Sequence, residues 1–293
     1  MNNQDNEKVF QNSQINWYPG HMNKARKEMI ELLPQVDLVY EIIDARIPIS
    51  SKIKDIDDII KNKPRILIMT KMDLCDLNET NKWKDYYESL GYKVVLVNFN
   101  DNNDFKKIVT ATKELAEEIN QKRINKGLRP KELRALVVGI PNVGKSTFIN
   151  KMAGKKVAQT GNMPGVTKNL VWLKTKYNII LLDTPGILWP KFETLELGMN
   201  LASCAAIKID ILDKHEVAMH ILNKLSDLYP NILKERYGID EFNMDIVEES
   251  YEAIGKKYGC LIKGGEIDYE RVSNQVINDV RNEAVKGITF DRR

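Results

Sequence analysis

The feature that most constrains this chain is a Gly-rich stretch near its middle. It reads Gly139-Ile140-Pro141-Asn142-Val143-Gly144-Lys145-Ser146-Thr147, which fits the pattern G-x-x-x-x-G-K-S. The apolar residues 135–138 before it predict a buried strand, and residues 146–152 after it predict the start of a helix. In such a strand–loop–helix unit, backbone N–H groups close around phosphate oxygens at a helix N-terminus. The stretch therefore predicts a site for the phosphates of a nucleoside triphosphate.

The side chains of this loop have expected roles in binding and in hydrolysis. Lys145 is expected to reach the β- and γ-phosphates and to stabilise negative charge, and the Ser146 hydroxyl is expected to bind Mg²⁺. The predicted phosphate-contacting residues are Asn142, Val143, Gly144, Lys145, Ser146 and Thr147.

A second element that would face the γ-phosphate follows later in the chain. Residues 178–182 predict a strand, and it ends at Asp183-Thr184-Pro185-Gly186, a D-x-x-G element. Asp183 is expected to act on Mg²⁺ through bound water, and the N–H of Gly186 is expected to meet the γ-phosphate. Thr167, in the polar loop between the two elements, is expected to give Mg²⁺ a second hydroxyl.

The base is expected to be read by Thr70-Lys71-Met72-Asp73, which follows the predicted strand 65–69. The tetrapeptide resembles N-K-x-D, with Thr70 in place of the usual Asn. The Asp73 carboxylate can accept from both N1–H and the 2-amino group of guanine, whereas adenine has no donors there, and the Lys71 stem would lie against the base. Asn98 and Phe99, after the predicted strand 93–97, are assigned to the base loop by position alone.

The alternation of predicted strands and helices indicates an α/β fold, a mostly parallel sheet with helices on both faces. Within it, strands are expected at 36–43 and 170–173 and helices at 23–33, 80–90 and 105–119, with Ser50 or Ser51 capping a helix through Ile60. From residue 194 on the strand pattern stops, and helices are expected at 194–209, 214–227, 230–236, 246–257 and 269–285. We expect a loose tail at 1–15, a nucleotide-binding domain at 16–192 and an all-α domain at 193–293.

The order of the motifs indicates a circular permutation. The guanine motif usually follows the phosphate loop, but here Asp73 precedes Gly139 by 66 residues. The same strands can still bring their loops to one sheet edge, because sheet geometry does not depend on chain order. The chain then leaves the nucleotide domain directly after residues 183–186, so nucleotide state is expected to reorient the helical domain.

Composition excludes several classes of protein. No apolar run approaches the roughly 18 residues of a membrane-spanning helix. The polar first twelve residues lack a signal-peptide core, and three widely spaced cysteines give no disulfide or zinc pattern. Residues 122–134 hold six cations and one acid and are a candidate for contact with an RNA backbone, or else a solvated linker. Those cations are Lys122, Arg123, Lys126, Arg129, Lys131 and Arg134.

At this point the chain resembles the circularly permuted GTPases of the YlqF/RbgA family, the ribosome biogenesis GTPase A family. The resemblance covers nearly the whole chain: the opening Trp17-Tyr18-Pro19-Gly20-His21-Met22, the segment Asp44-Ala45-Arg46-Ile47-Pro48, the permuted motifs and a helical tail. It implies a cytoplasmic, monomeric bacterial GTPase that acts late in assembly of the large ribosomal subunit. It also implies hydrolysis stimulated by that subunit, with RNA contacted by the helical tail.

The resemblance also assigns two residues that the motifs alone leave open. The position after D-x-x-G, where many GTPases have a Gln that orients water, is Ile187 here. The resemblance nominates His21 for this catalytic role, whereas the residue by itself would be interpreted as a capping or packed histidine. Asn142 resembles the residue that helps to hold K⁺ in K⁺-dependent relatives.

Two other functions remain open from the sequence. One is an RNA-bound GTP switch that binds nucleotide but hydrolyses it very slowly. The other is an ATPase in which T-K-x-D occurs by chance. Turnover with and without large subunits separates the first from a GTPase, and competition by ATP tests the second.

Overall fold

The computed structural model describes residues 20–157, 171–184 and 194–293, apart from the side chains of residues 20–23, 25 and 210. Its centre is a sheet of six strands in the order β3-β2-β1-β4-β6-β5. The strands are β1 (Leu38–Asp44), β2 (Arg65–Thr70), β3 (Lys93–Leu96), β4 (Leu133–Val138), β5 (Val171–Lys174) and β6 (Ile179–Asp183). Only the edge strand β5 is antiparallel to its neighbour, so the expected mostly parallel sheet is confirmed.

Helices cover both faces of this sheet. The helices of this part are α2 (Gly20–Leu32), α3 (Ile56–Ile60), α4 (Leu77–Ser89), α5 (Asn102–Ile124) and α6 (Lys145–Ala153). On one face Ile43 of β1 packs in a cluster with Trp83 of α4. On the other face the Tyr40 hydroxyl bonds to Thr112 of α5 at 2.8 Å, and the Tyr40 ring contacts Phe148 of α6. Strands covered on both sides explain why β1 is buried at every position.

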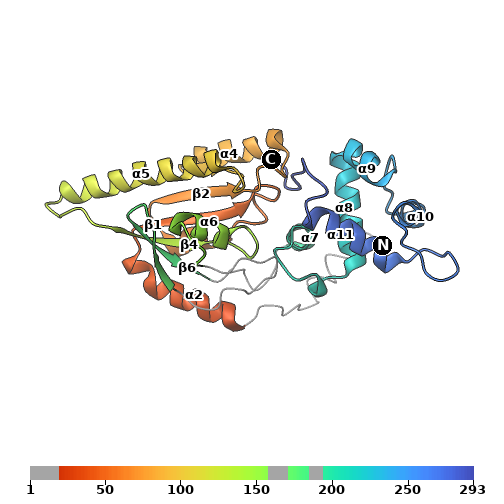
Figure 1. Cartoon of the computed structure of the whole chain (residues 1–293), viewed down its shortest axis with the longest axis horizontal. Coiled ribbons are helices and arrows are strands. Elements are labelled where there is room, and N and C mark those ends of the chain that lie inside the picture. Colours follow the sequence, from red (N-terminus) through yellow and green to blue (C-terminus); the bar gives the residue numbers. More distant parts are fainter. Residues whose placement is uncertain (1–19, 158–170, 185–193) are drawn as a thin grey trace.

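From residue 194 on the chain is helical, as the sequence predicts. Its helices are α7 (Leu195–Ser203), α8 (Lys214–Leu228), α9 (Pro230–Tyr237), α10 (Val247–Tyr258) and α11 (Tyr269–Arg281), with a short 3₁₀ turn, η2 (Ile209–Ile211). We call these helices the helical region. Helix α8 packs on α11, and each helix buries apolar residues spaced by four, Val217 and Ile221 on α8 and Val272 and Val276 on α11. Figure 1 shows this region beside the carboxyl edge of the sheet.

Several expected boundaries differ from the structure. Ser50 and Ser51 do not cap a helix, because α3 begins only at Ile56 and follows Asp55. The Ser51 hydroxyl donates to the Ile47 carbonyl at 2.6 Å, and the Ser50 hydroxyl donates to Asp291 at 2.6 Å. Both hydroxyls are therefore used in contacts that a local capping rule does not consider.

Helix lengths also differ. Helix α5 continues to Ile124, so Lys122 and Arg123 of the basic run lie in its last turn, where cations favour the helix dipole. Helix α7 ends at Ser203, shortly before Ala205 with its positive φ of 62°. None of the helices within the described ranges is both long and apolar enough to cross a membrane.

Candidate functional site

The parallel strands place the predicted motifs at one edge of the sheet. Asp44 at the end of β1 is in register with Thr70 at the end of β2, and Val137 of β4 is in register with Asp183 at the end of β6. Loops that follow these strands therefore meet, although the residues lie far apart along the chain. This is the edge at which open α/β sheets bind their ligands.

The phosphate loop needs glycine at two positions. A Cβ at Gly139 would overlap the backbone carbonyl of Ile42 in the neighbouring strand β1. Gly144 precedes α6 with φ of 99°, and a Cβ there would lie 3.0 Å from the ring of Phe99. The two glycines thus let the loop turn tightly against β1 and the base loop.

Lys145 is the first residue of α6, and its side chain is buried. Its ammonium donates to the Ile140 carbonyl at 2.8 Å, across the loop. Burial lowers its pKa to about 8, although the nearby Asp183 carboxylate opposes this shift. The cation is therefore held at the loop that is expected to carry phosphates, in surroundings where an anionic ligand would stabilise its charge.

Asp183 faces this lysine from the end of β6. Burial raises its pKa to about 6, and Lys145 opposes the shift. Its Oδ1 is buried and has no hydrogen-bond partner among the described residues. A buried carboxylate oxygen that lacks a donor is suited to a cation and its bound water.

These residues fit the expected Mg²⁺ site. Ser146, in the first turn of α6, and Asp183 supply oxygen atoms of the kind that Mg²⁺ prefers, while Thr167 lies outside the described residues. Within the described ranges no group of three or more His, Cys, Asp or Glu side chains could hold a metal ion. An ion here would therefore take further ligands from nucleotide phosphates and water, as Mg²⁺ commonly does.

The base motif is joined to the phosphate loop by one hydroxyl. Thr70 Oγ1 lies 2.8 Å from the Val143 carbonyl and 3.0 Å from the Ile43 carbonyl, and Thr70 is fully buried. The Thr in place of Asn thus still links the two motifs. Asp73, three residues on, is exposed at this edge, so its carboxylate is accessible to a base.

Lys71 is held by the ion pair of Asp44 and Arg46, two residues that were not among the predicted site residues. Its ammonium donates to Asp44 Oδ2 at 2.7 Å, and Arg46 holds the same carboxylate through Nε and Nη2 at 3.0 and 2.8 Å. Burial opposes the charge of Asp44, but Arg46 and Lys71 more than offset it and lower its pKa well below the usual range. The signal for these residues was their place at the carboxyl end of the buried strand β1, which is in register with β2.

The structure places some of the remaining predicted residues beside the phosphate loop, and others lie outside the described ranges. Phe99 packs on Phe148 with ring centroids 6.4 Å apart and lies beside Gly144, whereas the Asn98 side chain accepts from the Asn100 N–H within its own turn. Asn142 has a positive φ of 61°, and its Nδ2 donates to the Ala205 carbonyl at 2.6 Å. The side chain of His21, and Thr167 and Gly186, lie outside the described residues.

Taken together, the fold and this edge define a class of protein. A phosphate loop, a buried lysine and aspartate, and a base motif on a strand that precedes the loop in the chain are the parts of a circularly permuted P-loop GTPase. The helical region follows the last of these parts.

Comparison with known proteins narrows the class. A family profile described as "50S ribosome-binding GTPase" matches residues 134–249. The chain is 46% identical over 278 residues to ribosome biogenesis GTPase A of Priestia megaterium, covering 94% of this chain and 96% of the relative. It is 45% identical over 278 residues to the protein of the same name from Bacillus licheniformis, covering 95% and 98%. The chain therefore belongs to the ribosome biogenesis GTPase A family and is a GTPase.

The fold agrees with a solved structure. The crystal structure of GNP-bound YlqF from T. maritima superposes with a TM-score of 0.65 at 25% identity, covering 92% of this chain and 98% of that one. The resemblance expected from the motifs is thus confirmed over nearly the whole length.

The bridging hydroxyl of Thr70 gives a first prediction. Thr70→Val keeps the shape but leaves two buried carbonyls without this donor, so the free energy of unfolding is expected to fall by about 1–2 kcal/mol. Affinity for GDP is expected to fall as well, because the phosphate loop loses its link to the base motif. Urea unfolding and titration with GDP measure the two effects.

Thr112→Val is the matched control, since Thr112 is also buried and bonds to Tyr40 away from the loop. It is expected to lose a similar amount of stability and to keep the GDP affinity. Unchanged GDP affinity in Thr70→Val would contradict the bridging role.

A second prediction follows from the raised pKa of Asp183. Because its pKa in the folded protein is about 6, above the usual value, the folded protein binds a proton more readily than the unfolded chain. Stability is therefore gained as pH falls through about 6, by roughly 3 kcal/mol in total, of which roughly 2 kcal/mol is gained by pH 4.5. Thermal unfolding of nucleotide-free wild type and Asp183→Asn is compared from pH 7 to pH 4.5. The wild type is expected to gain stability relative to the variant, and a constant difference would show that the carboxyl does not titrate there.

Proposed function

We propose that this protein hydrolyses GTP to GDP and phosphate during late assembly of the large, 50S, ribosomal subunit, and that the subunit particle stimulates the hydrolysis. The observation that carries GTP as substrate is the bond from Thr70 to the Val143 carbonyl, since it joins the base motif to the phosphate loop. The ribosomal role is supported by the names of the relatives and of the matching family.

Each residue of the site has its own role in hydrolysis. Lys145 supplies a fixed positive charge beside the transferred phosphoryl group, and Asp73 selects guanine. When bound through Ser146, Thr167 and Asp183, Mg²⁺ would neutralise charge on the phosphates. The backbone N–H of Gly186 is assigned to the γ-phosphate.

The attacking water needs a group to orient it, and Ile187 cannot hydrogen-bond water. We assign this role to His21, which lies in the first turn of α2 by sequence position. For the monovalent cation we assign Asn142, whose amide carries a carbonyl oxygen of the type that binds K⁺. A K⁺ ion held there would add a further fixed positive charge at the phosphates.

The chain divides into a tail and two domains with different partners in this proposal. We propose that residues 16–192 form the GTPase domain after a tail at 1–15, and that residues 193–293 bind the ribosome. Its partners are then GTP or GDP and the ribosomal RNA and proteins of the large subunit. We further propose that the protein is a monomer, acts in the cytoplasm and does not bind a membrane.

A third prediction tests this function directly. GTP turnover by the wild type is expected to rise when purified large-subunit particles are added, and to be higher in K⁺ than in Na⁺ buffer. His21→Ala is expected to abolish the stimulated turnover, while GDP affinity stays close to that of the wild type. Phosphate release and GDP titration supply both readouts.

Each alternative function has its own outcome in this experiment. Binding without stimulated turnover would identify a nucleotide-dependent RNA-binding switch. Effective competition by ATP would identify an ATPase. Normal stimulated turnover in His21→Ala would remove the histidine from the mechanism, and equal rates in Na⁺ and K⁺ would remove the cation.

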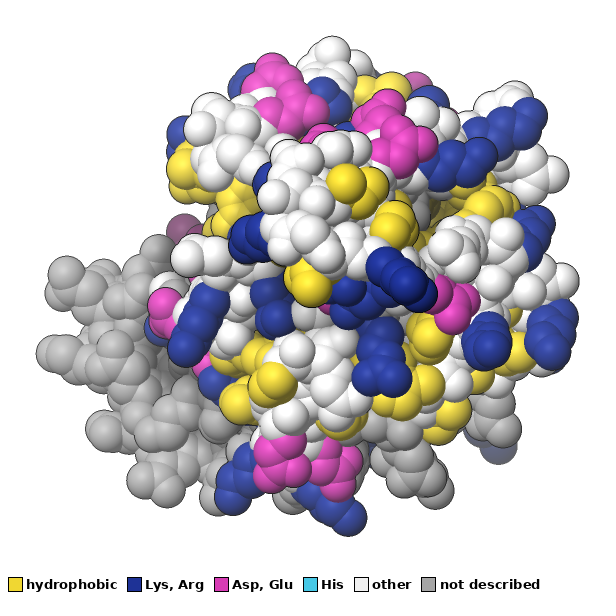
Figure 2. All heavy atoms as spheres, turned by 90° about the vertical axis from the view of Figure 1, so that its left-hand side faces the viewer, with side chains coloured by type: hydrophobic (Ala, Val, Ile, Leu, Met, Phe, Trp, Pro, Cys, Tyr) yellow, Lys and Arg dark blue, Asp and Glu magenta, His cyan; other side chains and the backbone are white. Residues whose placement is uncertain are grey.

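A surface for ribosomal RNA is supported by the basic run at the far end of the sheet. Residues 122–134 connect α5 to β4, so they lie at the amino ends of the strands, opposite the nucleotide edge. Figure 2 shows Lys and Arg side chains across the middle of this face. An RNA bound here would leave the nucleotide site open.

The cations of this run are not equally available. Lys131 pairs with Asp37 at 2.7 Å, and Arg134 bonds to Gln35 at 2.7 Å. The side chains of the exposed Lys122, Lys126 and Arg129 have no hydrogen-bond or ion-pair partner within the described ranges. These three are therefore the best placed to contact phosphates.

A fourth prediction tests whether binding depends on these particular side chains or only on the net charge of the protein. Lys126→Glu with Arg129→Glu is expected to weaken binding to large-subunit particles and to reduce the salt dependence of log K by about 1 per lost phosphate contact. Lys106→Glu with Lys113→Glu, exposed positions nearer the start of α5, make the same change in net charge and are expected to have little effect. Equal losses in both double variants would argue for long-range attraction alone.

A further inference from the structure

The chain returns from the helical region to the base motif. After α11, residues 287–293 run back to the start of α4, as Figure 1 shows by the position of the C label. The N–H groups of Gly287 and Ile288 donate to the Leu74 carbonyl at 2.8 and 3.1 Å. Leu74 directly follows Asp73, so the backbone of the base motif is bonded to this returning segment.

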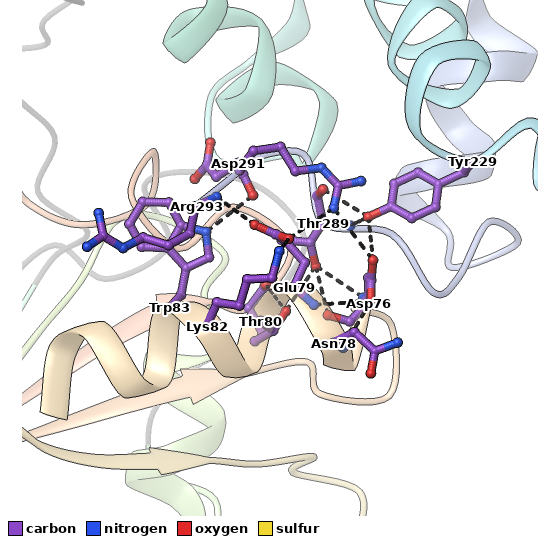
Figure 3. A network of polar contacts seen from close by, with 12 residues as sticks. Asp76, Asn78, Glu79, Thr80, Lys82, Trp83, Tyr229, Thr289, Asp291 and Arg293 are labelled. Atoms are coloured by element: carbon purple, nitrogen blue, oxygen red, sulfur yellow. Dashed lines mark hydrogen bonds and ion pairs between the residues drawn. The ribbon is translucent and has the colours of Figure 1, made fainter.

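The next residues hold the turn that leads into α4. The Asp76 N–H donates to the Thr289 hydroxyl at 3.1 Å, and the Tyr229 hydroxyl donates to Asp76 Oδ2 at 3.1 Å (Figure 3). The Thr289 N–H in turn donates to Tyr229 at 2.8 Å. Asp76 itself caps α4 by accepting from the N–H groups of its first turn. Tyr229, between α8 and α9, and Thr289 of the returning segment thus fix the cap that ends the base-motif turn.

A second set of contacts connects the helical region to the motif through Arg46. Arg46, which holds Asp44 and through it Lys71, also donates from Nη1 to the Val280 carbonyl of α11 at 3.1 Å. The Arg46 carbonyl accepts from the Phe290 N–H at 2.8 Å. Arg46 is almost fully buried, so its position depends on these partners. Both Lys71 and Asp73 are therefore connected to the helical region, by different routes.

The returning segment is itself firmly anchored. The Asp291 carboxylate accepts from the N–H groups of Ile49 and Ser50, both at 2.8 Å, and from Asn200 of α7 at 3.0 Å. The Arg293 guanidinium lies 3.8 Å from the centre of the Tyr86 ring on α4. Because these contacts fix the segment on both parts of the molecule, it can transmit a displacement of the helical region.

We infer that the helical region sets the position of the guanine-reading residues, with Tyr229 and Arg46 as positioning residues. The inference rests on the proposed function, because it concerns the same guanine site. A partner that draws the helical region away from α4 would then weaken binding of the base. By thermodynamic linkage, bound guanine nucleotide would equally favour the docked helical region.

The test uses inosine diphosphate, which keeps N1–H but lacks the 2-amino group that Asp73 would also bind. Tyr229→Phe removes only the hydroxyl and is expected to lower affinity for GDP about three- to tenfold, the effect of one or two hydrogen bonds. Affinity for inosine diphosphate is expected to fall less, so that the ratio of the two affinities shrinks. Arg46→Lys, which keeps the charge but loses the paired contacts, is expected to act in the same direction.

Tyr251→Phe is the matched control. Its hydroxyl bonds to Ser273 at 3.1 Å, within the helical region and away from the base motif, and Tyr251 is buried. This variant is expected to keep the wild-type affinities for both nucleotides, whatever stability it loses.

The ratio of GDP affinity to inosine diphosphate affinity distinguishes the possible outcomes. A wild-type ratio of GDP to inosine diphosphate affinity in both Tyr229→Phe and Arg46→Lys would overturn the inference, even if both affinities fell together. A smaller ratio in these variants and not in Tyr251→Phe would support it. If the wild type itself does not prefer GDP to ADP, the proposed function fails, and the inference falls with it.

Discussion

Parallel pairing of β1, β2, β4 and β6 is the constraint on which the rest of this structure depends. It fixes the register of Asp44 with Thr70 and of Val137 with Asp183, and so it gathers the loops after these strands at one edge. Neither pairing requires the strands to follow one another in the chain. The guanine motif can therefore precede the phosphate loop, provided that side chains such as Thr70 still connect the two.

Two buried carboxylates at this edge have opposite electrostatic environments. Asp44 is surrounded by two cations, which lower its pKa despite burial. Asp183 has one nearby cation and an oxygen without a donor, and burial raises its pKa to about 6. The first arrangement is satisfied within the protein and holds Lys71 in place. The second remains unsatisfied within the described residues, which is typical of a group that acts on a ligand.

The sequence was sufficient for those parts of the fold that local patterns encode. The phosphate loop, the strands before Thr70 and Asp183 and the five helices after residue 194 follow from apolar runs, glycines and spacing. The environment of Arg46 could not be predicted, because its partner Val280 lies 234 residues away. The same reason explains the error at Ser50, whose hydroxyl bonds to Asp291 across 241 residues.

The helical region is attached to the GTPase part by more than its covalent connection, and this limits how it can move. In the chain, its covalent connection follows the D-x-x-G element, which we assign to the γ-phosphate, whereas residues 287–293 bind beside Leu74, next to the base motif. A rotation driven only from the γ-phosphate side would have to break the contacts of Asp291 and Tyr229 or carry the base motif with it. If the proposed site residues hold guanine, both results would change how it is held. The state of the phosphates and the affinity for the base would then be coupled through the same helices, unlike in a domain attached by a single flexible linker.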